Sequence, residues 1–285
     1  MENKRYIINL SCEDHAGIIR DVATFVSSRG GNVLQSNQST DEVTNQFFLR
    51  MDFEVPVVVD FEMLQSDFAG IAELHRMKWR IAQADRKGRM LVMVSQYGHC
   101  LNDLLFRTNI GALNAEIVAI VSNHETFRGL ADHYGVPFYH LPVTPETKLE
   151  REQQLLKLID EYRVDLVVLA RYMQILSESL CERLPGKVIN IHHSFLPSFK
   201  GARPYHQAHA RGVKLIGATA HYVTSDLDEG PIIEQEVARV DHGMSPTELS
   251  ALGRDVECSS LSRAVKWHLE ERIILDENRR TIVFR

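Results

Sequence analysis

From residue 89 onward, short apolar runs alternate with segments of helical periodicity, and this alternation restricts the possible folds most strongly. The apolar runs lie at 90–95, 115–121, 165–170 and 187–192. Strands that are apolar on both faces are typical of parallel sheets, which helices cover on either side. The pattern therefore predicts an α/β domain with a mostly parallel sheet. In such sheets, functional residues gather in loops beyond the carboxyl ends of the strands.

The preceding part of the chain follows a different pattern. It predicts a strand, a helix, two strands, a helix and a last strand, at 5–11, 17–28, 32–39, 45–53, 60–75 and 79–82. This βαββαβ order is that of a small ferredoxin-like sandwich. A short charged linker that ends in Gly88 follows. We therefore expect two domains, residues 1–84 and residues 89–285.

Charge and cysteine content narrow the class of protein. The net charge of −6 argues against a general binder of nucleic acid, because such proteins cluster Lys and Arg. The four cysteines form no CxxC pair and suggest no disulfide framework. The N-terminus lacks the features of a signal peptide, and no apolar run reaches the length of a membrane span. We expect a cytoplasmic protein without nucleic-acid or membrane partners.

The strand-like run at 187–192 carries two polar residues of catalytic type, Asn190 and His192. They are two residues apart, so both project to the same side of the strand. An imidazole can transfer a proton near neutral pH, and an amide can donate to an oxygen that becomes negative in a tetrahedral intermediate. The pair therefore suits acyl transfer or hydrolysis. The same spacing also fits an asparagine that caps a turn and a buried histidine.

A polar loop supplies candidate carboxylates for this pair. A strand ends near Val223, and Asp226, Asp228 and Glu229 follow. A carboxylate can hold an imidazolium through a charge-assisted hydrogen bond and can orient a water molecule. Since acidic residues in loops are usually only solvated, the pattern alone leaves open whether any of the three acts.

The segment from 190 to 231 resembles the core of the formyltetrahydrofolate-dependent transformylases and hydrolases. That family pairs Asn-Ile-His with a Ser-x-Leu-Pro turn and a later DxDxG-like loop. In this sequence they fall on residues 190–192, 194–197 and 226–230. The resemblance implies a Rossmann-like formyl transferase domain with Asn190, His192 and Asp228 as the catalytic residues. We expect folate as the substrate, with no prosthetic group and no bound metal.

The same resemblance places the folate pocket. The loop after the 165–170 strand resembles the family's folate-binding segment, whose backbone would hydrogen-bond the pterin. The implied substrate-binding residues in this loop are Ala170, Arg171, Tyr172, Met173, Ile175 and Leu176. Thr224 and Gly230 belong to the loop that would close the other side. His193 points away from His192 on the strand, and a structural role and a folate contact both stay open for it.

The segment after the first strand of the second domain bears on what attacks the formyl group. A transformylase must hold the phosphate of its amine substrate, which a glycine-rich loop can do through backbone N–H groups. Residues 95–105 contain only Gly98, between Tyr97 and His99, and resemble the matching segment of formyltetrahydrofolate deformylases. Water is therefore the expected acceptor. A role for His99 stays open.

The predicted reaction is hydrolysis of 10-formyltetrahydrofolate to formate and tetrahydrofolate. It would supply formate for purine biosynthesis and balance the one-carbon pools. The alternative is a folate-dependent transformylase that acts on a purine-precursor amine, because the same catalytic residues would serve either acceptor.

The first domain resembles ACT domains, small regulatory modules that often bind amino acids. The resemblance rests on residues 12–19 and implies effector roles for Asp14, His15, Gly17 and Ile18. Asp14 could instead cap the following helix. Since such domains commonly pair through free sheet edges, we expect a homo-oligomer, either a dimer or a tetramer. An amino-acid effector and a purely structural module both fit the sequence.

Overall fold

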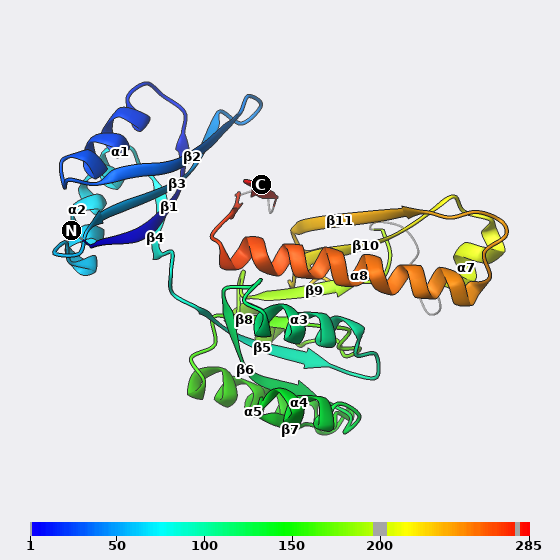
Figure 1. The fold of residues 1–285 in the computed structure, drawn as a ribbon. Coiled ribbons are helices and arrows are strands. Elements are labelled where there is room, and N and C mark those ends of the chain that lie inside the picture. Colours follow the sequence, from blue (N-terminus) through cyan, green and yellow to red (C-terminus); the bar gives the residue numbers. More distant parts are fainter. Residues whose placement is uncertain (1, 196–203, 277–279) are drawn as a thin grey trace. The chain divides into compact units, whose positions relative to one another are not determined.

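The computed structural model describes residues 2–195, 204–276 and 280–285, and the chain divides into two compact units (Figure 1). The first unit comprises Met1–Arg86 together with Glu270–Arg285, and the second comprises Lys87–Leu269. The expected second domain, 89–285, differs from this division at its end, because the last sixteen residues, 270–285, contact the first unit.

The first unit contains a four-stranded antiparallel sheet in the order β2-β3-β1-β4, with both helices on one face. Its elements are β1 (Asn3–Glu13), α1 (Ile18–Ser27), β2 (Asn32–Asp41), β3 (Gln46–Pro56), α2 (Phe61–Leu74) and β4 (Lys78–Gln83). Alternate residues of the strands and the apolar stripes of the helices form one core, in which Phe25 packs edge-on against Phe68. The predicted βαββαβ order is confirmed.

A buried arginine on the other face of this sheet holds the C-terminal segment. Arg50 of β3 is 2% exposed, and its guanidinium donates to the carbonyl oxygens of Glu270 and Glu271, each at 3.0 Å. Asp52 lies two residues along the strand and 3.8 Å from the Arg50 Nη2 atom. The guanidinium of Arg50 thus supplies donors to two backbone carbonyls, and the carboxylate of Asp52 lies beside it.

The C-terminal residues complete this face with a short hairpin. Strands β12 (Ile273–Leu275) and β13 (Thr281–Val283) pair antiparallel, and Ile274 and Phe284 pack against Phe48 of β3. This C-terminal hairpin therefore belongs to the first unit.

The second unit contains a seven-stranded sheet in the order β11-β10-β9-β8-β5-β6-β7. The strands are β5 (Gly88–Val94), β6 (Ala115–Ser122), β7 (Phe138–His140), β8 (Leu166–Leu169), β9 (Val188–His192), β10 (Leu215–Tyr222) and β11 (Ile232–Arg239). The pairs from β9 to β7 are parallel, whereas β10 is antiparallel to both of its neighbours. The predicted mostly parallel sheet is confirmed.

Helices cover this sheet, as buried apolar strands require. The described helices are α3 (His99–Asn109), α4 (Arg128–Tyr134), α5 (Lys148–Glu161), α6 (Glu178–Arg183), α7 (Pro204–Arg211) and α8 (Pro246–Leu269). Helices α3 and α8 contact each other, and α8 also lies along β9, β10 and β11 (Figure 1). Helices α5 and α6 share a core with β5, β8 and β9. Within the described ranges, no helix is long and apolar enough to cross a membrane.

We expect Arg50→Ala to lower the free energy of unfolding by about 3 kcal/mol, because two buried carbonyls lose their charged donor. Arg80 is the matched control: it lies 2.9 Å from the carboxylate of Glu271, but its side chain is 66% exposed. Arg80→Ala should therefore cost less than about 1 kcal/mol. Urea unfolding of the full-length variants, followed by circular dichroism, measures both. Equal losses would contradict the role of Arg50.

Candidate active site

The structure brings the three predicted catalytic side chains together on one face of the second sheet. Asn190 and His192 lie on β9, and Asp228 lies in the loop between β10 and β11. The Oδ2 atom of Asp228 is 3.2 Å from Nδ1 of His192. An amide, an imidazole and a carboxylate therefore share one side of the strand.

Asp228 reaches His192 because its loop folds back over the sheet. Since β10 is antiparallel to β9, Thr219 lies opposite His192, and the end of β10 lies beside the start of β9. The chain must then return, and Asp228 adopts a left-handed backbone conformation with φ 57°. Gly230 packs so closely on Tyr222 that a Cβ atom would overlap the Tyr222 carbonyl oxygen. Only glycine allows this approach.

A fourth polar residue, His221, joins the site, and the sequence analysis did not identify it. It lies opposite Asn190 in the β9–β10 ladder, and its Nε2 atom is 3.2 Å from the Nδ2 atom of Asn190. Its Nδ1 atom is 2.8 Å from the carbonyl oxygen of Tyr222. Because a carbonyl only accepts, Nδ1 carries a proton, and Nε2 of the neutral ring can accept from the Asn190 amide. This contact orients Asn190 and leaves its second N–H for another acceptor.

The carboxylate of Asp228 is held ionised. The hydrogen bond from His192 is the largest of the effects that keep the pKa of this carboxyl well below its usual range, against the opposing effect of burial. Nδ1 of His192 faces this carboxylate. The Nε2 atom of His192 is buried and has no hydrogen-bond partner in the part of the chain that the structure describes. That atom is the one available to a substrate.

A cavity of about 240 Å³ lies beside these groups. Of the predicted substrate-binding residues, six line it: Arg171, Tyr172, Met173, Ile175, Leu176 and Thr224. The other two lie behind its wall, since Ala170 is fully buried at the end of β8 and Gly230 packs on β10. Gln174, Cys181, Val223 and Leu227 also line the cavity, although no role was predicted for them.

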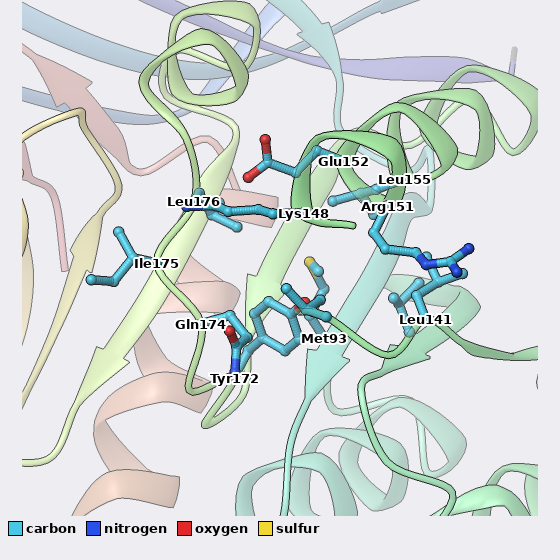
Figure 2. A pocket seen from close by; sticks show the side chains of 12 residues that line it. Met93, Leu141, Lys148, Arg151, Glu152, Leu155, Tyr172, Gln174, Ile175 and Leu176 are labelled. Carbon is cyan, nitrogen blue, oxygen red and sulfur yellow. The ribbon is translucent and has the colours of Figure 1, made fainter. Parts of the chain in front are cut away.

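A second, smaller hollow adjoins the loop of residues 172–176. Tyr172 and Gln174–Leu176 line both hollows. Figure 2 shows that α5 contributes Lys148, Arg151 and Glu152 to this hollow. The carboxylate of Glu152 accepts hydrogen bonds from the backbone N–H and the hydroxyl of Ser177. Two cationic side chains thus stand at the continuation of the cavity.

One group of potential metal ligands occurs among the described residues. The ligand atoms of His99, Cys100 and Glu257 lie within 4.8 Å of one another. A hydrogen bond with Cys258, together with burial, raises the pKa of the Cys100 thiol, and Arg171 lies 3.5 Å from the Glu257 carboxylate. A protonated thiol and an adjacent guanidinium both disfavour a cation, so we interpret this group as an internal ion pair.

The predicted effector residues of the first unit do not form one exposed group. Asp14 does not cap α1; its carboxylate accepts from the Thr40 hydroxyl at 2.9 Å. Gly17 is the N-cap residue, with φ 106°, and Ile18 is part of the buried core. His15 is exposed, and it contacts His75 as described below.

Comparisons with known proteins agree with the two-part architecture. The family model for formyl transferases matches residues 88–265, and that for the ACT domain matches residues 6–65. A formyltetrahydrofolate deformylase from Corynebacterium sp. (strain P-1) is 48% identical over 100% of this chain and 99% of its own length. That of Bacillus subtilis (strain 168) is 47% identical over 96% of this chain and 92% of its own.

Solved structures give the same result. The crystal structure of formyltetrahydrofolate deformylase from Burkholderia mallei is 48% identical and covers 99% of this chain and 100% of its own, with a TM-score of 0.94. A glycinamide ribonucleotide transformylase from Symbiobacterium toebii is 29% identical and covers 70% of this chain and 95% of its own, with a TM-score of 0.65.

We expect Asp228 to stay ionised below pH 3.9, the approximate value at which an ordinary aspartate is half protonated. Because its pKa is lower in the folded chain, ionisation of Asp228 stabilises the fold above pH ~3.9 and ceases to do so as the pH falls towards the folded value. Carbon-13 NMR of labelled aspartate carboxyls measures this, with Asp228→Asn to assign the signal. His192→Asn should raise the pKa of Asp228; an unchanged titration would contradict the assigned cause.

Proposed function

The chain belongs to the family of formyltetrahydrofolate deformylases, and we propose that Asn190, His192 and Asp228 carry out its reaction, the hydrolysis of 10-formyltetrahydrofolate to formate and tetrahydrofolate. The observation that carries the proposal is the 3.2 Å contact between Asp228 and His192, on the strand that also carries Asn190. The contact lies beside a cavity that can hold part of a folate.

The proposed mechanism divides the work among these groups. The free N–H of Asn190 and Nε2 of a protonated His192 donate to the formyl oxygen, where negative charge develops. Asp228 balances the imidazolium and positions the water. The water oxygen bonds to the formyl carbon and loses a proton, and the bond from that carbon to the folate N10 then breaks. N10 takes up a proton, which gives tetrahydrofolate and formate.

We propose that the folate lies between two loops. The backbone of residues 170–176 would hydrogen-bond the pterin, and the 224–230 loop would close the opposite side. The folate carries a glutamate with free carboxylates, so its tail would extend towards Lys148 and Arg151 in the adjoining hollow. This placement accounts for two cations beside an otherwise largely apolar pocket.

The wider role follows from the reaction. We propose that the formate supplies purine biosynthesis, that hydrolysis balances the one-carbon pools, and that the chain acts in the cytoplasm. We also propose a homo-oligomer, a dimer or a tetramer. Strand β2 is an edge of the first sheet and its residues are largely exposed, which leaves backbone groups for pairing with a second copy.

We propose that the ACT domain binds an amino acid near His15. Nε2 of His15 is 2.8 Å from Nδ1 of His75, while Nδ1 of His15 faces the Glu13 carbonyl and Nε2 of His75 faces the Asp21 carboxylate. The Glu13 carbonyl and the Asp21 carboxylate can only accept, so the three hydrogen bonds need three protons on the four ring nitrogens. Two neutral imidazoles carry two protons, so the two rings together carry one positive charge. The positive charge close to the exposed His15 suits a carboxylate ligand.

Isothermal calorimetry of the full-length protein with glycine and methionine tests this proposal. We expect binding to one of them, and His15→Ala should weaken it about tenfold or more, because it removes the charge that the two paired imidazoles share. Met63→Ala, at an exposed position of α2, should bind as the parent does. Equal affinity of the His15 variant would contradict the placement, and no heat with either amino acid would favour a structural role.

We expect Asn190→Ala and Asp228→Asn each to lower kcat by about 100-fold or more, because each removes a group that stabilises the transition state. Asp132→Asn is the matched control, since Asp132 is an exposed carboxylate of α4 that does not line the cavity. Its kcat should stay within about twofold of the parental value. Formate release from 10-formyltetrahydrofolate measures all three. A folded Asp228→Asn protein that releases formate at the parental rate would overturn the assignment.

A further inference from the structure

A buried ion pair stands at the edge of the cavity, on the side of α3 and α8. Glu257 of α8 is 1% exposed. Its carboxylate accepts hydrogen bonds from Nε2 of His99 and from the hydroxyl of Tyr205, each at 2.7 Å, and lies 3.5 Å from Nε of Arg171. Burial raises the pKa of Glu257, but the hydrogen bond from His99 and the charge of Arg171 lower it further, so the carboxylate stays ionised.

Arg171 connects this pair to the cavity. It lies two residues after the end of β8, lines the cavity and has a left-handed backbone conformation with φ 64°. Its carbonyl oxygen accepts from the backbone N–H of Ser95 at 3.2 Å, and its guanidinium lies 5.6 Å from the ring centre of Tyr97. The side chain is 10% exposed, and Nη1 has no hydrogen-bond partner among the described residues. A fixed guanidinium therefore occupies this wall.

Two side chains, those of Phe127 and Glu257, pack against the N-terminus of α3. Gly98, the N-cap residue, packs against Phe127 so closely that a Cβ atom would overlap the ring. His99, the first residue of the helix, is bonded to Glu257. The N-terminus of a helix attracts anions, and the carboxylate of Glu257 lies near this end because it bonds the side chain of His99. A phosphate bound at this end of α3 would therefore lie near a like charge, that of Glu257.

The residues that line the cavity have different roles in the proposed reaction. The 172–176 loop and the 223–227 segment would enclose the folate. Arg171 and His193 line the same cavity as the side chains of Asn190, His192 and Asp228. Burial, and then the charges of Arg171 and His192, lower the pKa of His193 to about 4, so this ring is neutral near pH 7. A nucleophile other than water would have to replace the Arg171 side chain.

We infer that Arg171, held by Glu257, closes the acceptor side of the cavity to amines and leaves room only for water. The inference rests on the proposed placement of the folate, and it makes these two residues determinants of hydrolysis against transfer. Glu257 acts here as a positioning residue, because it touches Arg171 and not the reacting atoms. The space left in the cavity decides between hydrolysis and transfer, because an amine is larger than water and reacts only where the cavity can hold it.

Removal of the Arg171 side chain should open this wall to a small amine. In the resulting reaction, the amine nitrogen bonds to the formyl carbon, and the bond from that carbon to N10 breaks. The proton that the amine loses passes to N10. The products are a formamide and tetrahydrofolate, and the amine replaces water without any further reactant.

Arg171→Gly tests the inference, since glycine accepts a φ of 64° without strain. The probe is glycinamide, an amine without phosphate, added to 10-formyltetrahydrofolate; formate and N-formylglycinamide are measured together. The parent should form formate alone. In the variant, the formylated fraction should rise with glycinamide concentration to about tenfold or more above the parental background.

Arg163→Gly is the matched control, because Arg163 also has a positive φ, of 48°, and does not line the cavity. Its products should equal those of the parent. If Arg171→Gly does not fold, the double variant with Glu257→Gln removes both buried charges and should show the same formyl transfer.

A variant that still hydrolyses the folate but forms no formylglycinamide would overturn the inference, as would formylation by the parent. A parent that releases no formate would overturn the proposed function instead.

Discussion

The reversal of the chain between β10 and β11 is the constraint on which the site depends. β10 runs against the direction of β9, so the loop leaves β10 far from His192 and has to fold back over the sheet. Two local features make the return possible: Gly230 lies against the carbonyl of Tyr222, and Asp228 takes a left-handed conformation. A left-handed non-glycine residue costs free energy, which the hydrogen bonds to its carboxylate offset. The proposed catalytic contact between Asp228 and His192 and the strained backbone at Asp228 are thus one structural feature.

Two buried charges of the described residues, Arg50 and Glu257, and the half-buried Asp228 each have partners. Arg50 has two carbonyls and Asp52, Asp228 has two imidazoles, and Glu257 has His99 and Arg171. Replacing such a pair by apolar groups is often neutral or stabilising, so these groups are weak contributors to net stability. Their effect is on geometry. An unpaired buried charge costs free energy, so each charged side chain holds its partner in position. In the second unit, that fixed geometry surrounds the cavity.

The sequence predicted what depends on local pattern and missed what depends on register. The alternation of apolar runs with helical segments predicted the second sheet, and the order of strands and helices predicted the first. The spacing of Asn190 and His192 placed both on one face. His221 was missed because its position opposite Asn190 follows only from the antiparallel pairing of β10 with β9. The attachment of residues 270–285 to the first unit was missed because Arg50 gives no sign of its carbonyl partners. Ile18, a predicted effector residue, belongs to the core because apolar periodicity and a binding loop overlap there.

The proposed catalytic residues would serve either water or an amine, and the backbone at Arg171 bears on which of the two attacks the formyl carbon. A position with φ 64° suits glycine, and an arginine there is strained. Such strain persists only where the surrounding structure compensates for it. The compensation here comes from Glu257, whose own charge is costly to bury unless a cation lies beside it. Since each residue stabilises the other, the guanidinium stays in the cavity wall. The choice of water over an amine therefore depends on a mutual requirement between two side chains, neither of which belongs to the catalytic three.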